Sequence, residues 1–232
     1  MKRLSIIIPA YNERHTIRRV LEAASAAGLP EGVERELIVV DDGSVDGTGE
    51  LVASLSDELP LRLVRLETNR GKGAAIRAGI PHAAGQWILI QDGDLEYDPS
   101  CYRALVEPLA RGQAQVVYGS RFLGTIEQMG WPYRLVNRLL VLWTNLLYRS
   151  RITDEATAYK AFDTELLKSV ELRCRRFEFC PEVTGKLLRR RVPIHEVPVR
   201  YLGRSKAQGK KIRWYDAFVA FWVLLRERLA PR

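Results

Sequence analysis

Short apolar runs and segments with helical spacing alternate along the first half of the chain. Continuous apolar runs are typical of strands buried on both faces, and apolar residues every three or four positions are typical of helices. The runs are Leu4–Ile8, Glu36–Val40, Leu61–Leu66 and Trp87–Ile90, and the helical segments are Glu13–Ala27, Gly47–Leu55 and Gly73–Ala84. This alternation predicts an α/β fold, in which helices flank a mostly parallel central sheet.

The second half adds further helices and a late strand. The expected elements are helices over Tyr102–Arg111, Tyr133–Tyr148, Val183–Leu188 and Ile212–Leu229, and strands over Gln115–Tyr118 and Ile194–Tyr201. Pro193 and Pro198 favour an edge position for the last strand, because proline has no N–H to donate. No repeat or linker divides the 232 residues, so we expect one Rossmann-like domain over residues 1–232.

Polar residues follow the predicted strands of the first half. They are Tyr11–Glu13, Asp41–Asp42, Asn69 and Asp92–Asp94. Ligands of parallel sheets bind beyond the carboxyl ends of the strands, so these clusters predict one active site. Two carboxylates flanking a glycine can hold Mg²⁺ or Mn²⁺, and the ion then offsets charge on a departing nucleoside diphosphate. An acidic turn without a ligand is the alternative, and the neighbouring polar strand ends favour the metal.

Charge divides unevenly between the halves. Residues 1–110 hold 12 Lys and Arg against 17 Asp and Glu, a balance of −5, whereas residues 111–232 hold 24 against 11, a balance of +13. A basic half indicates an anionic partner, such as a phosphorylated substrate, an anionic membrane or nucleic acid. The three cysteines and three histidines form no disulfide framework and no zinc motif.

Neither a secretory leader nor a membrane span is expected. Pro9 ends the first apolar run, and the longest one, Ala217–Leu225, has nine residues where a span needs roughly 20. We therefore expect a cytoplasmic protein that can lie on the inner face of the cell membrane. Leu135–Tyr148 and Tyr215–Leu229 suit this surface, since both are rich in Leu and Trp and flanked by basic residues. Core packing explains the same pattern equally well.

Several segments together resemble the inverting family 2 glycosyltransferases of GT-A fold, in the branch of dolichyl-phosphate mannose synthase and bacterial polyprenyl-phosphate sugar transferases. The matching segments are Ser5–Glu13, Ile38–Ser44, Asp46–Thr48, Asn69–Gly73, Gln91–Glu96, Gly119–Phe122, Thr153–Asp154 and Ala158–Phe162. The resemblance implies a UDP- or GDP-linked sugar donor, Mg²⁺ or Mn²⁺, and a polyprenyl (dolichyl or undecaprenyl) phosphate or other membrane lipid as acceptor. It divides the domain into a nucleotide-sugar half, residues 1–125, and a basic acceptor and membrane half, residues 126–232.

The resemblance also implies roles for single residues. Asp92 and Asp94 would bind the metal, with Glu96 where relatives often place a further ligand, commonly Gln. The expected donor-binding residues are Pro9, Ala10, Tyr11, Asn12, Glu13, Asp42, Lys72, Asp92, Gly93, Asp94, Arg204 and Lys210. Among these, Asp42 would contact the base or ribose. Arg204 and Lys210 belong to a late loop that would close over the diphosphate, in which Lys206 or Lys211 could replace Lys210.

The acceptor decides what chemistry the site needs. A hydroxyl acceptor needs a general base, whereas a lipid phosphate is already ionised near neutrality and needs cations. Arg121, which would also face phosphate at the reaction centre as a catalytic residue, joins Arg134 and Arg138 as the expected cations. Asp154 and Glu182 would act near the acceptor, either as base or paired with these arginines, and the ion pairs are favoured. Relatives commonly place a small hydroxyl residue after the first helix arginine, and this chain departs from that pattern.

Other functions are kept open or excluded by specific features. A family 2 enzyme acting on a sugar or glycolipid hydroxyl, and a non-catalytic protein that binds nucleotide sugars, remain alternatives. The glycines around Lys72 follow the third strand and lack the third glycine of a dinucleotide-binding loop, which argues against an NAD enzyme. Charge is the only feature that suggests nucleic-acid binding, so we expect no nucleic-acid partner. A membrane-anchored partner subunit could provide the contact with the lipid.

Overall fold

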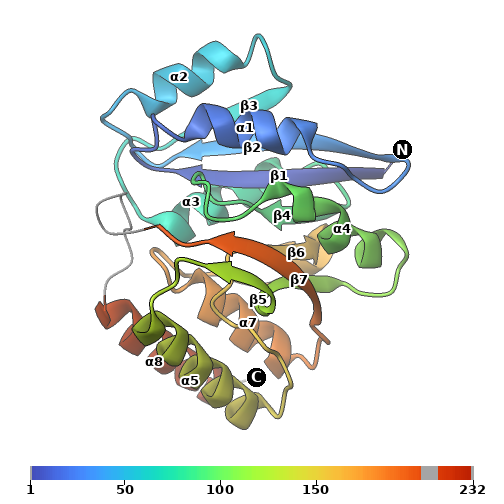
Figure 1. The fold of residues 1–232 in the computed structure, drawn as a ribbon, viewed down its shortest axis with the longest axis vertical. Helices are drawn as coiled ribbons and strands as arrows, with labels where there is room; N and C mark the ends of the chain where they lie inside the picture. Colours follow the sequence, from blue (N-terminus) through green and yellow to red (C-terminus); the bar gives the residue numbers. More distant parts are fainter. Residues whose placement is uncertain (1, 205–213, 231–232) are drawn as a thin grey trace.

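The computed structural model describes residues 2–204 and 214–230. In it, a single sheet carries helices on both faces. Within these residues the sheet has seven strands in the order β3-β2-β1-β4-β6-β5-β7 (Figure 1). The strands are β1 Lys2–Ala10, β2 Val33–Asp41, β3 Leu61–Arg65, β4 Trp87–Ile90, β5 Val116–Glu127, β6 Lys160–Asp163 and β7 His195–Leu202. All neighbouring pairs are parallel except those of β6, which is antiparallel to both neighbours.

Helices cover both faces of this sheet and bury two apolar clusters. One cluster lies under α1 (Ile17–Ala26), α2 (Thr48–Leu55) and α4 (Tyr102–Ala110). The other lies under α3 (Lys72–Gly79), α6 (Thr164–Lys168) and α7 (Phe179–Arg189). The 3₁₀ turns Ile80–His82 and Pro99–Cys101 follow α3 and precede α4.

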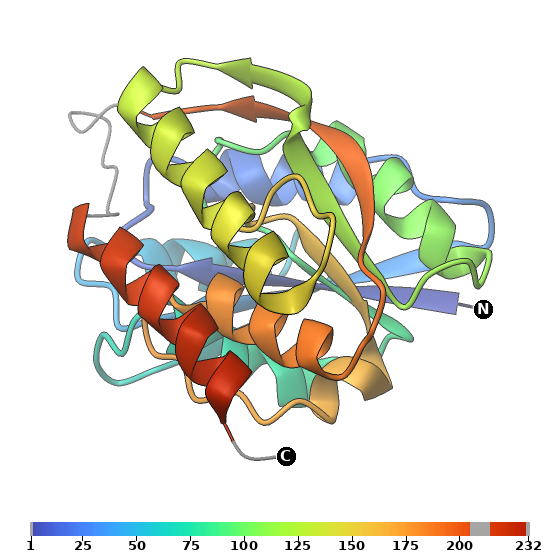
Figure 2. The same ribbon diagram turned by 90° about the horizontal axis from the view of Figure 1, so that it is seen from below.

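Two long helices form an outer layer beside α7. Helices α5 (Trp131–Tyr148) and α8 (Trp214–Leu229) pack against each other and against α7, and Figure 2 shows the three side by side. Trp143 of α5 meets Phe221 of α8, with ring centroids 6.3 Å apart. No helix among the described residues combines the length and the apolar character needed to cross a bilayer.

The expected single α/β domain with a mostly parallel central sheet is confirmed, and the last strand lies at the sheet edge as expected. Two features differ from the sequence prediction. The short strand β6 is not among the predicted elements. It begins with Lys160, which is buried, whereas a lysine is expected at the surface. Strand β5 continues beyond Tyr118 to Glu127, because after an irregularity between Ser120 and Thr125 it pairs again with β7.

Candidate active site

The carboxyl ends of β1, β2 and β4 meet at one edge of the sheet, as the sequence predicts. The Asp42 amide donates to the Ala10 carbonyl oxygen at 2.8 Å, and the Gln91 amide donates to that of Ile7 at 3.0 Å. Both bonds continue the parallel ladders one residue past the strands. The turn over Asp92–Asp94 therefore starts beside the end of β1.

Gln91 fixes the start of that turn from within the core. The phenol groups of Tyr102 and Tyr159 both donate to Gln91 Oε1, at 2.7 and 2.6 Å, and Gln91 Nε2 donates to the Asp92 carbonyl oxygen at 2.9 Å. All three side chains are fully buried. This buried bracket, which the sequence analysis did not identify, sets the direction in which Asp92 leaves the sheet; a polar residue directly before the acidic turn was its only signal.

Gly93 lets the turn lie against β1. A Cβ at this position would be 3.1 Å from the Pro9 carbonyl oxygen, which is tighter than ordinary packing. The Gly93 carbonyl oxygen accepts a hydrogen bond from Thr16 Oγ1 at 3.0 Å. Pro9, Ala10 and Gly93 thus form a close-packed floor beneath the two aspartates.

Each aspartate of the turn meets a cation. Lys72 Nζ, at the first residue of α3, lies 2.5 Å from Asp92 Oδ1. Burial disfavours the charged ammonium, but the Asp92 carboxylate outweighs burial and raises the pKa of Lys72. Lys72 is therefore charged at neutral pH and holds Asp92 on the α3 side of the site.

Arg204 enters the same site from the end of β7. Its guanidinium contacts Asp94 through Nη2 and Glu13 through Nη1, the latter at 3.4 Å, and its amide donates to Glu96 Oε1 at 2.8 Å. Arg204 Nε is buried and has no hydrogen-bond partner within the described residues. Burial, together with the nearby carboxylates of Asp92 and Glu96, raises the pKa of Asp94 to about 7, although Arg204 opposes this shift.

These carboxylates fit a hard divalent ion, because Mg²⁺ and Mn²⁺ prefer oxygen ligands and their charge would relieve the crowding. The described residues nevertheless contain no group of three acidic, histidine or cysteine side chains spaced to hold an ion. The expected set of Asp92, Asp94 and Glu96 is not assembled here. Asp92 turns to Lys72 and Asp94 to Arg204, while Glu96 accepts from Tyr201 Oη at 3.0 Å.

Asp42 and Asn12 hold loops of the expected nucleoside pocket. Asp42 is buried, and its two oxygens accept from the amides of Arg70 and Gly71 at 2.8 and 2.7 Å. Burial raises the pKa of Asp42, and these backbone bonds counteract the rise. Asn12 has a φ of 51° and its Oδ1 accepts from the Val45 amide at 3.0 Å. Contacts of these side chains and of the half-buried Tyr11 with a nucleoside stay predictions.

Arg121 and Asp154 form a buried, two-pronged ion pair. Arg121 Nε and Nη2 each donate to one Asp154 oxygen at 2.7 Å, and the Arg121 amide adds a third bond at 3.0 Å. Burial would lower the pKa of Arg121, but Asp154 outweighs it and raises the pKa. Asp154 thus makes the ion pair that we favoured for it, and its place near the acceptor stays a prediction. With both oxygens engaged and no exposure, Asp154 has no room to act as a base.

Arg134 and Arg138 lie exposed on the first turns of α5, and both contact β5 or the loop after it. Arg134 donates to the carbonyl oxygens of Met129 and Ile126 at 3.1 and 3.3 Å. The Arg138 guanidinium lies 5.8 Å from the Phe122 ring centroid. The structure leaves these two cations at the surface and buries Arg121 inside the protein.

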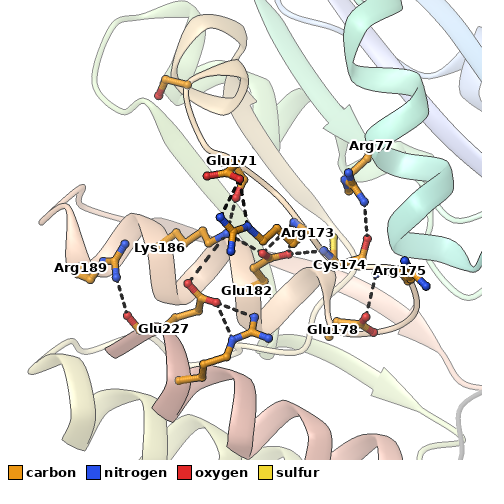
Figure 3. Close-up of polar contacts among 12 residues, drawn as sticks. Arg77, Glu171, Arg173, Cys174, Arg175, Glu178, Glu182, Lys186, Arg189 and Glu227 are labelled. Carbon is orange, nitrogen blue, oxygen red and sulfur yellow. Dashed lines mark hydrogen bonds and ion pairs between the residues drawn. The ribbon is translucent and has the colours of Figure 1, made fainter. Parts of the chain in front are cut away.

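Glu182 has another role than the acceptor contact that we expected. It is fully buried in α7 and accepts from the amides of Arg173 and Cys174 at 2.9 and 2.7 Å, and from Lys186 Nζ at 2.6 Å. Figure 3 shows its carboxylate directed at this segment. Its ionic partner is therefore a lysine one turn along α7 rather than Arg121, Arg134 or Arg138. The expected loop residues Lys206, Lys210 and Lys211 lie outside the described residues.

A second buried polar group lies beside the ion pair. Lys160 Nζ donates to the Glu155 carbonyl oxygen at 2.7 Å and lies 3.6 Å from the Tyr118 ring centroid. The Glu155 carboxylate is buried without a hydrogen-bond partner among the described residues, and burial raises its pKa to about 7. Sequence reasoning missed this group, since neither residue stands at a predicted strand end.

Comparison with known proteins gives a family and a fold. Residues 5–170 match the family described as Glycosyl transferase family 2. The chain is 29% identical over 223 residues to a dolichol-phosphate mannosyltransferase of Pyrococcus furiosus, covering 92% of this chain and 61% of that protein. It is 28% identical to a polyprenol monophosphomannose synthase of Mycolicibacterium smegmatis, covering 95% and 87%. The chain thus spans about three fifths of some curated relatives it matches.

A solved structure supports the fold independently. Glucosyl-3-phosphoglycerate synthase of Mycobacterium tuberculosis, in complex with Mn²⁺, UDP and glucosyl-3-phosphoglycerate, superimposes with a TM-score of 0.75. Its sequence is 23% identical, and the match covers all of this chain and 81% of that one. The expected GT-A fold is confirmed.

Proposed function

Because the chain belongs to glycosyl transferase family 2, we propose that it transfers a sugar from a nucleoside diphosphate to a polyprenyl phosphate at a membrane surface. The observation that carries this proposal is the edge where Asp92, Asp94 and Glu13 lie against Lys72 and Arg204. Such an edge can hold a metal through its carboxylates and a diphosphate through its cations. The names of the Pyrococcus and Mycolicibacterium relatives support the lipid phosphate as acceptor.

Asp92 and Asp94 are the proposed ligands of Mg²⁺ or Mn²⁺, and Glu96 would join them only after leaving Tyr201. A bound ion would neutralise charge on the diphosphate leaving group. In the structure Lys72 and Arg204 neutralise the same carboxylates, so each is a tethered counterion that the metal would displace. Both cations would then be available to diphosphate oxygens, for which the planar fork of arginine is well suited.

The site favours a phosphate acceptor over a hydroxyl. A hydroxyl needs a general base, and the acidic residues expected near the acceptor are already engaged, Asp154 with Arg121 and Glu182 with Lys186. A phosphate monoester needs only cations, which Arg134 and Arg138 offer at the surface. The buried Arg121 supports this region from below through its neighbour Phe122, on which Arg138 lies.

We propose that α5 and α8 bring the enzyme to the inner face of the cell membrane. Both helices expose large apolar side chains although they pack against each other. The exposed residues are Trp131, Leu135, Val136, Leu139, Leu142 and Leu146 on α5, and Phe218, Val219, Trp222 and Leu229 on α8. Apolar faces flanked by arginines suit an anionic interface, and a membrane-anchored partner subunit could cover part of the same surface.

The decisive experiment offers UDP- and GDP-sugars with Mg²⁺ or Mn²⁺ and polyprenyl phosphate in detergent. We expect transfer that chelator abolishes, and loss of transfer in Asp92→Asn and Asp94→Asn while circular dichroism is unchanged. Glu107→Gln, on the outer side of α4, is the matched acidic control. Full transfer by the wild-type protein in the presence of chelator would refute the requirement for a metal. Tight donor binding without turnover would identify a nucleotide-sugar-binding protein instead. Transfer only to a sugar hydroxyl would show that the acceptor is a hydroxyl and not polyprenyl phosphate.

A further inference from the structure

A cavity of about 390 Å³ lies at the carboxyl ends of α5, α7 and α8. Four of its seven lining residues are arginines and none is acidic: Tyr148, Arg149, Leu188, Arg189, Arg191, Arg228 and Ala230. We call it the arginine pocket. It follows the last turn of α5, about 22 Å along the helix from Arg134 at 1.5 Å per residue. The pocket is therefore separate from the proposed acceptor cations.

Two of the arginines have backbone conformations that favour glycine. Arg149, directly after α5, has a φ of 53°, and Arg191, two residues after α7, has a φ of 59°. A side chain on an L-residue is disfavoured there, and helices that end in this conformation usually carry glycine or asparagine. Within residues 2–204 and 214–230 neither guanidinium makes a hydrogen bond or an ion pair. Nothing in the described protein explains why arginine stands at both positions.

The other two arginines are held in place by the ends of helices. Arg189 Nη1 donates to the carbonyl oxygens of Glu227 and Ala230 at 3.1 and 3.3 Å, the first of which Figure 3 draws. Arg228 Nε donates to the Leu147 carbonyl oxygen at 2.9 Å. The pocket thus combines two fixed guanidinium groups with two that have no partner. Four like charges around one cavity repel each other, and an anion would remove that repulsion.

We propose that the arginine pocket binds a phosphate ester, with the headgroup of an anionic phospholipid as its source. Guanidinium groups bind phosphate oxygens in pairs, which suits a pocket with several of them. The apolar side chains nearest its rim in sequence, Leu146 of α5 and Leu229 of α8, are 71% and 73% exposed. A lipid would satisfy both features at once, whereas a soluble phosphate ester would use only the cations. Such a site holds the far ends of α5 and α8 at the bilayer.

The test uses Arg149→Asn combined with Arg191→Asn, because asparagine tolerates this backbone conformation and removes the charge. The matched control, Arg19→Gln with Arg103→Gln, removes two charges from exposed arginines on α1 and α4. Binding is measured with phosphatidylcholine vesicles that contain or lack phosphatidylglycerol, and with glycerol 3-phosphate in solution. Thermal unfolding of every variant verifies the fold, and the pocket variant should melt no lower than wild type.

We expect the pocket variant to bind phosphatidylglycerol vesicles about tenfold or more weakly, and the control less than twofold more weakly. Glycerol 3-phosphate that binds wild type and not the pocket variant would support the phosphate site and point to a soluble source. Equal losses in the two variants would reduce the effect to net charge and overturn the proposal. Unchanged binding in the pocket variant would also overturn it. Each result leaves the transferase assignment intact, since Asp92, Asp94 and Arg204 are untouched.

Discussion

The carboxylates at the ends of β1 and β4 and the ion pair between β5 and the loop before β6 solve the same electrostatic problem differently. Asp94 keeps 10% of its side chain exposed and meets Arg204, whose Nε is left without a hydrogen bond. Asp154 is fully buried, and three hydrogen bonds from Arg121 engage its two oxygens. The first arrangement can exchange one cation for another at small cost, and the second cannot. Exchange suits substrate turnover, so we call the sheet edge with Asp94 and Arg204 the exchangeable region. Permanence suits a support for the acceptor side, so we call the surroundings of Arg121 and Asp154 the permanent region.

Asp154→Asn should have the largest effect on folding. It leaves the buried Arg121 charge without its counterion, and removing one partner of a buried pair costs about 3–5 kcal/mol of unfolding free energy. Urea titration followed by circular dichroism measures the change. The exposed pair of Arg18 and Glu58 is the control, and Glu58→Gln should cost less than about 1 kcal/mol. A similar, small effect of both substitutions would remove the distinction between permanent and exchangeable pairs.

Glu155 makes the permanent region sensitive to pH. Its carboxyl pKa rises from 4.5 to about 7, chiefly by burial, while Lys160 opposes the shift and Asp154 adds to it. The folded state then binds the proton more tightly than the unfolded state, so stability falls as pH rises from about 4.5 to 7. Glu155→Gln should stabilise the protein at pH 8 by about 1–3 kcal/mol and leave it nearly unchanged at pH 4.5.

The measurement for Glu155 is the difference in unfolding free energy between wild type and Glu155→Gln across this pH range. Asp94 has the same direction of shift, but it is present in both proteins and cancels in the difference. Glu165→Gln, on the short helix α6, provides the control for replacing a glutamate by glutamine elsewhere in the domain. A flat difference for Glu155→Gln would show that its carboxylate finds a partner in solution.

Arg204→Ala tests the exchangeable region. Without the tethered counterion, no guanidinium competes with a metal for Asp94, so Mn²⁺ affinity in the absence of donor should increase several-fold. Transfer should fall, because the diphosphate loses a guanidinium. The loss of unfolding free energy should lie between about 1 kcal/mol, the upper value for exposed pairs, and about 3 kcal/mol, the lower value for buried ones, because both side chains are mostly buried. Titration of Mn²⁺ by electron paramagnetic resonance reports the affinity, with Arg200→Ala as control; weaker Mn²⁺ binding would show that Arg204 supports the site instead of competing.

The sequence determines much of the exchangeable region and little of the permanent one. Apolar strands followed by polar turns located Asp92, Asp94 and Glu13, because the carboxyl ends of parallel strands share an edge. Whether a carboxylate faces lysine, arginine or metal depends on side chains from α3 and from the end of β7, which no local pattern places. Glu182 shows the limit: it matches an acidic position in the relatives that the sequence resembles, yet tertiary packing directs it to backbone amides.

Helix ends add a smaller contrast that stability measurements can sharpen. Arg190 and Arg191 are neighbours after α7, with φ of −76° and 59°. Arg191→Gly relieves a disfavoured conformation and should raise the unfolding free energy by about 0.5–1 kcal/mol. Arg190→Gly has ordinary backbone and loses its bonds to Ser169, so it should lower stability by about 1 kcal/mol. Urea titration decides between them. Changes of opposite sign in the two unfolding free energies mean that Arg191 is retained for something other than folding. Changes of equal sign would make Arg191 an ordinary surface residue and would remove the backbone argument for a ligand in the arginine pocket.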